Sequence, residues 1–136
     1  MPDFLTPYSE ALLLTSAVLI LIMVQSVVAT IFRNAVEKYQ AGEALPANHA
    51  SITFRMVRSF ENSLENVVIF APVIAAAIAV SVSPTWIWWV AFLFLIGRIG
   101  HWVMYALNIP ALRTAFFATG FFATLALAVK TALTLI

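Results

Sequence analysis

The stretch Leu12–Phe32, LLLTSAVLILIMVQSVVATIF, decides the fold class of this chain. It contains no charged residue, and Gln25 is its only side chain more polar than a hydroxyl. A helix needs about 20 mostly apolar residues to cross the roughly 30 Å of hydrocarbon in a bilayer. The stretch therefore predicts a transmembrane helix.

The composition of the whole chain agrees with a membrane setting. Of its 136 residues, 63% are hydrophobic and 10% are charged, and the net charge is +1. Soluble domains carry about 25% charged residues, so the composition argues against a soluble enzyme, a disordered chain and a nucleic-acid partner. The chain has no cysteine, so any thiol chemistry would need a thiol from a substrate.

Three further apolar stretches follow, at Val67–Val82, Thr85–Tyr105 and Thr114–Ile136. The first of them is short, and it spans a bilayer only if its helix extends back toward Ser51. The stretches are continuous and do not alternate, which favours helices over a barrel. We therefore predict an all-α fold, a transmembrane four-helix bundle that forms a single integral membrane domain over residues 1–136. The expected helices lie at about 9–36, 51–82, 85–107 and 111–135.

Basic residues beside the loops predict the orientation. Arg33, Lys38 and Arg55 flank the polar loop 34–50, and Arg113 flanks the third connection. The positive-inside rule then places both connections in the cytoplasm and both termini outside. Lys130 opposes this pattern, but it lies close enough to the carboxyl terminus to snorkel outward. The short loops favour a multi-pass protein of a bacterial inner membrane.

Two expected helices carry polar residues at helical spacing. The second has Arg55, Arg58, Asn62 and Glu65, and the third has Arg98, His101 and Tyr105, followed after the Pro110 break by Arg113. Residues three and four apart share one helix face. Ionisable groups inside a membrane cost about 2.5 to 3.5 kcal/mol each, so they usually face a bundle interior or a wet cavity.

The simpler interpretation is that these stripes are interhelical ion pairs that hold the bundle together. Arg55, near the membrane edge, is as well explained by snorkelling to lipid headgroups. Four helices with short turns leave no obvious way to bury both stripes in one protomer, however, so we favour an oligomeric interface with a polar pocket on the cytoplasmic side. No other histidine lies near His101 in sequence, and we expect no metal site.

The residue types indicate the ligand that such a pocket would suit. Arginines favour carboxylates, and Glu65 favours an ammonium group. A small zwitterion with more than one carboxylate fits both. A lipophilic co-substrate can reach the same place from the membrane lipids.

Two stretches resemble the signatures of a known family. Residues 55–66, RMVRSFENSLEN, and residues 98–105, RIGHWVMY, with Arg113 after them, are similar to second- and third-helix motifs of the MAPEG family, the membrane-associated proteins in eicosanoid and glutathione metabolism. The chain resembles a bacterial-type member similar to microsomal glutathione transferases. The resemblance covers nearly the whole chain.

The resemblance implies a homotrimer that binds glutathione, as co-substrate, between neighbouring subunits. The residues that it places at glutathione are Arg55, Arg58, Asn62, Glu65, Arg98, His101 and Tyr105. Arg113 matches the arginine that stabilises the glutathione thiolate, Tyr105 is a further candidate catalytic residue, and Thr114 is a candidate donor to the same sulfur. Glu37 matches an acidic residue that some members place near that arginine. Relatives have a basic or apolar residue at the position of Glu61. We expect the Glu61 carboxylate to pair with Arg58.

The function implied is a detoxifying membrane glutathione transferase, or glutathione peroxidase, that acts on lipophilic electrophiles or hydroperoxides. One alternative is a non-catalytic lipid-binding or scaffold protein of the same fold. A small multidrug-type transporter is the other alternative. Such transporters need a carboxylate within the first helix, whereas Glu10 lies at the outer end of that helix.

Overall fold

The computed structural model of the protein describes residues 2–36, 38–40 and 43–136, and the described residues form helices and no strand. The elements are the 3-10 helix η1 (Asp3–Tyr8), α1 (Ser9–Ile31), the π-helical turn η2 (Phe32–Val36), α2 (Ile52–Ala79), α3 (Pro84–Ala106) and α4 (Pro110–Thr134). Four of these helices are long and apolar enough to cross a membrane. The predicted all-helical class with four spans is confirmed.

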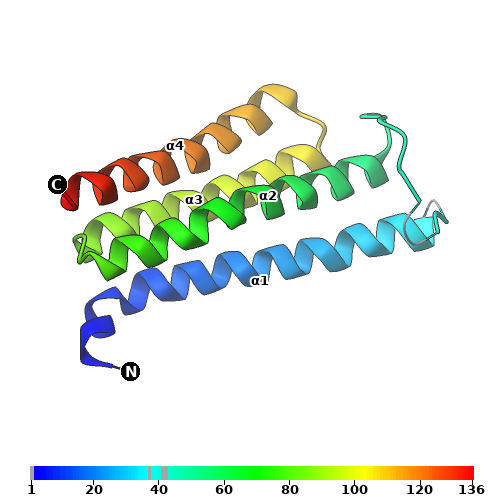
Figure 1. Ribbon diagram of the computed structural model, residues 1–136. Helices are drawn as coiled ribbons and strands as arrows, with labels where there is room; N and C mark the ends of the chain where they lie inside the picture. Colours follow the sequence, from blue (N-terminus) through cyan, green and yellow to red (C-terminus); the bar gives the residue numbers. More distant parts are fainter. Residues whose placement is uncertain (1, 37, 41–42) are drawn as a thin grey trace.

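The four long helices lie side by side, and each runs antiparallel to the one before it in the chain (Figure 1). The connection from α1 to α2 and the connection from α3 to α4 lie at one end of the bundle, which we call the loop end. Both termini and the α2–α3 turn lie at the opposite end. Helices α2 and α3 each pack against the other three long helices, so their side chains are best placed to form a shared interior.

Local sequence explains where the helices begin and end. The second helix does extend back toward Ser51, whose hydroxyl caps it by accepting a hydrogen bond from the Phe54 backbone N–H at 3.1 Å. Proline occupies the first turn of α3 and of α4, where its missing N–H costs nothing. Ser81 and Asn108, just beyond the ends of α2 and α3, have left-handed φ angles of 58° and 56° that end each helix sharply.

The apolar core fills the half of the bundle away from the loop end. Phe70 of α2 and Phe94 of α3 stack with ring centroids 3.9 Å apart. The Tyr8 hydroxyl donates to the Val82 carbonyl oxygen at 3.1 Å and so ties the start of α1 to the α2–α3 turn. The outer surface is also apolar, as a helix bundle in lipid requires.

Candidate functional site

The site is built on a close approach of α3 to α4. A Cβ atom at Gly97 would lie 2.9 Å from the Phe116 carbonyl oxygen and 3.0 Å from the Gly120 nitrogen. At Gly100 a Cβ would overlap the Phe116 ring. Glycines at these positions let the two backbones touch, which fixes the polar residues of α3 against α4. We did not predict this contact, although the pair Gly97 and Gly100 was its sequence signal.

Arg98 lies fully buried inside the protomer. Its Nη1 donates to the Asn62 Oδ1 at 3.0 Å, which joins α3 to α2. The guanidinium also lies between the rings of Phe94 and Phe117, 5.5 Å and 5.6 Å from their centroids. Its Nε and Nη2 atoms have no hydrogen-bond partner among the residues that the structure describes. Arg98 is therefore a buried cation held by one amide and two aromatic faces.

His101, Tyr105 and Arg113 continue from Arg98 toward the loop end. The His101 and Tyr105 rings, both buried, meet edge to face with centroids 4.9 Å apart. The Arg113 guanidinium lies 4.4 Å from the Tyr105 ring centroid, within the range of a cation–π interaction. The structure thus brings the predicted third-helix stripe together with Arg113.

In the predicted second-helix stripe, Arg58 and Glu65 stay partly exposed, whereas Asn62 turns to Arg98. Arg58 Nη1 lies 3.0 Å from Glu65 Oε1 and 3.3 Å from Glu61 Oε2. The side chains of Arg58, Glu61 and Glu65 are 39%, 50% and 56% exposed. The expected pairing of Glu61 with Arg58 is confirmed. We refer to Arg58, Glu61 and Glu65 together as the Arg58 cluster.

The side chains of Arg55 and Thr114 donate hydrogen bonds to backbone carbonyl oxygens of other residues. Arg55 donates to the carbonyl oxygens of His49 and Ala50 at 2.7 Å and 2.9 Å, and to that of Ala106 at the end of α3 at 3.3 Å. It thereby joins the first loop to the carboxyl end of α3, a role that we did not predict. The Thr114 hydroxyl donates to the Pro110 carbonyl oxygen at 3.1 Å. The ligand roles of both residues stay predictions, and Glu37 lies outside the described residues.

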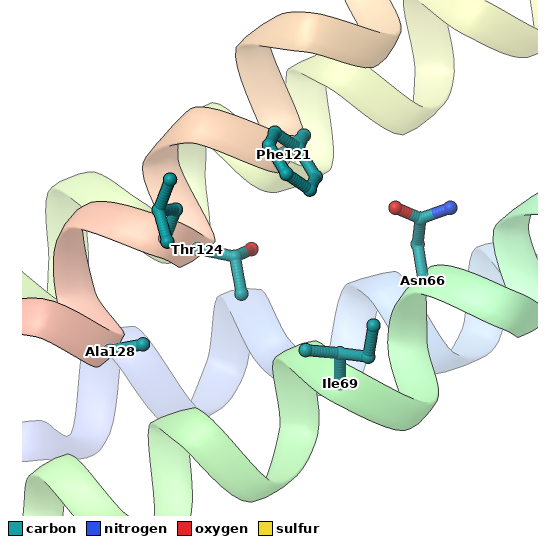
Figure 2. Close-up of a pocket in the computed structure, with 6 residues that line it drawn as sticks. Asn66, Ile69, Phe121, Thr124 and Ala128 are labelled. Carbon is teal, nitrogen blue, oxygen red and sulfur yellow. The ribbon is translucent and has the colours of Figure 1, made fainter.

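Two cavities lie along α2, and one of them adjoins the Arg58 cluster. One, of about 110 Å³, lies between α2 and α4. Figure 2 shows Asn66 and Ile69 on one side of it and Phe121 and Thr124 on the other. The other, of about 250 Å³, lies between the first loop and α2. Its charged lining residues are Arg33, Glu43, Arg58 and Glu61. The first cavity is apolar and the second is charged, so the two suit different ligands.

The charged groups fall into an interior line and an outward cluster. The line runs from Asn62 and Arg98 through His101 and Tyr105 to Arg113, and two of its members are cations without a carboxylate partner among the described residues. Such cations attract a carboxylate or a thiolate. The Arg58 cluster offers charges of both signs, which suits the ends of a zwitterion.

This architecture defines a small membrane protein of four helices that are long and apolar enough to span a bilayer. The sequence model of the MAPEG family matches residues 11–133. The chain belongs to the MAPEG family, and the resemblance noted from its motifs is confirmed. With its four spanning helices it is a multi-pass membrane protein. No curated protein and no solved structure matches the chain.

Proposed function

We propose that this protein binds glutathione at the loop end and uses its thiolate against lipophilic electrophiles or hydroperoxides. The observation that carries the proposal is the position of Arg113. Its guanidinium lies on the Tyr105 ring with no carboxylate among the described residues to neutralise it. Family membership, in a group that includes glutathione transferases, supports the same function.

The chemistry follows from the charge of Arg113. A free thiol has a pKa near about 8.5, and a fixed guanidinium beside it favours the thiolate. In a transfer reaction the sulfur forms a bond to an electrophilic carbon, and the leaving group departs with its electron pair. With a hydroperoxide the sulfur attacks one peroxide oxygen. The O–O bond breaks, the alkoxide takes a proton, and a second thiol completes the disulfide and releases water.

The exposed face of α2 supports an assembly of several copies. Glu65 lies 13 residues along α2 from Ile52, which is about 20 Å at 1.5 Å per residue. A half-exposed carboxylate at that depth would face lipid at a cost of about 2.5 to 3.5 kcal/mol. A neighbouring copy that covers this face removes the cost, so we propose the homotrimer implied by the family resemblance, with glutathione between subunits.

The distribution of charge supports an orientation. Arg33, Arg55 and Arg113 all lie at the loop end, whereas the opposite end of the bundle has Lys130 together with Asp3 and Glu10. The positive-inside rule then places the loop end in the cytoplasm. We propose that the site faces the cytoplasm of a bacterial cell, where glutathione and membrane-dissolved substrates can meet.

Replacement of Arg113 tests the function. Arg113→Ala removes the charge that stabilises the thiolate, so conjugation of glutathione to an aryl halide should fall on the order of 100-fold. The assembly should stay intact on size-exclusion chromatography, because Arg113 supports no ion pair among the described residues. Lys130→Ala is the matched control, since it removes the same charge from the far end of α4. Unchanged turnover in Arg113→Ala would refute the role of this residue.

A non-catalytic scaffold is the second candidate, because Arg58 is already paired with two carboxylates. Calorimetric titration of glutathione into the protein in lipid nanodiscs separates the two functions. We expect saturable heat of binding for the enzyme. An absence of heat, together with an absence of turnover, would favour the scaffold.

A further inference from the structure

The Arg58 cluster contains more negative than positive charge. Both glutamates contact the same atom of Arg58, Nη1, at 3.0 Å for Glu65 and 3.3 Å for Glu61. One guanidinium therefore faces two carboxylates, and the cluster has a formal charge of −1. An incoming carboxylate can reach this nitrogen only by displacing one of the two glutamates.

The adjoining cavity between the first loop and α2 does not offset this charge. Glu43 and Arg33 line it on the loop side, opposite Arg58 and Glu61. Arg33 is occupied, because its Nη2 donates to the backbone carbonyl oxygens of Gln40 and Glu43. The two arginines and three glutamates of this cavity and the Arg58 cluster sum to −1. An ammonium group meets attraction here, whereas a second carboxylate meets competition.

We propose that Glu61 is a selectivity residue that sets the charge of the preferred thiol. Because it holds Arg58 together with Glu65, the site favours an aminothiol with a single carboxylate over a thiol with two. Glutathione, with two carboxylates and one ammonium group, is accepted but held more weakly than analogues that have a single carboxylate. This inference rests on the proposed function, since it presumes that a thiol binds beside Arg58.

Two probe thiols and one substitution test the inference. The probes are glutathione and its glycine-carboxyl ethyl ester, which lacks one negative charge and is otherwise the same peptide. The wild-type protein in nanodiscs should bind the ester about fivefold more tightly, the upper end of what one exposed ion pair contributes. Glu61→Gln should tighten glutathione binding by a similar factor and bring the two dissociation constants together. The wild-type preference should also shrink as salt is added, because the cluster is half exposed.

Glu10→Gln is the matched control, because it removes the same charge from the opposite end of the bundle. It should leave the wild-type preference for the ester unchanged. Equal affinity of the wild-type protein for the two probes, or an unchanged ratio in Glu61→Gln, would overturn the inference while leaving the proposed function standing. If neither probe binds any variant, the proposed function fails and the inference fails with it. Glu61→Ala guards against an effect peculiar to the amide, and it should behave like Glu61→Gln.

Discussion

Arg98 has a full charge, is buried between helices and has one hydrogen-bond acceptor among the residues that the structure describes, Asn62 Oδ1 at 3.0 Å. A buried cation loses several kcal/mol of hydration. The aromatic faces of Phe94 and Phe117 return part of this, at about 0.5 to 2 kcal/mol for each cation–π contact. The Asn62 amide is therefore the contact on which the burial of Arg98 most depends.

The cost of burying the Arg98 charge predicts that substitutions of Asn62 and of Arg98 have opposite effects on stability. Asn62→Ala leaves Arg98 buried without an acceptor and should lower the free energy of unfolding by about 2 kcal/mol. Arg98→Met removes the charge itself and should leave stability unchanged or raise it by about 1 kcal/mol. Both values can be measured by denaturation of the purified protein in mixed micelles. Equal losses in the two variants would show that Asn62 does not support the Arg98 charge.

The sequence placed these residues on one face but did not identify their partners. The three- and four-residue spacing of Arg98, His101 and Tyr105 is a property of a single helix, so it could be recognised without a structure. The contact of Arg98 with Phe117, and that of Arg113 with Tyr105, depend on the register of α3 against α4. Spacing within one helix contains no information on that register.

At the scale of the elements, the packing of α3 on α4 decides whether the site exists. Three of the four helices were predictable from apolar length alone, and α2 was predictable once its short apolar stretch was extended back toward Ser51. Their pairing was not, because apolar surfaces are interchangeable in lipid. The close approach at Gly97, where Phe116 and Gly120 leave no room for a Cβ atom, supplies the specificity.

Two glycine substitutions on facing helices test this approach. Gly97→Ala would place a Cβ within 3.0 Å of α4 backbone atoms, so the helices must separate. We expect a loss of about 2 to 3 kcal/mol in the free energy of unfolding, with impaired binding of glutathione. Gly120→Ala is the control, because its Cβ would come no closer than 3.5 Å to any neighbour. Alanine is also the better helix former, so this variant should be as stable as the wild type or more so. Equal losses in both variants would contradict the account.

At the scale of the whole molecule, the protomer buries the polar residues of its core but leaves charged residues exposed on one face. The third-helix stripe is buried within the bundle, whereas the Arg58 cluster stays about half exposed on α2. The sequence led us to expect that one protomer would not bury both stripes, and the described structure buries one. A neighbouring copy on this face would enclose the Arg58 cluster next to the line from Arg98 to Arg113.

The most direct test of the account is a structure of the protein in nanodiscs determined with glutathione at saturating concentration. We expect three copies around one axis, with a peptide between neighbours whose charged ends lie at Arg58 and Glu65 and whose sulfur lies beside Arg113 and Tyr105. A single unassociated copy, or a peptide bound away from both Arg58 and Arg113, would contradict the proposed site.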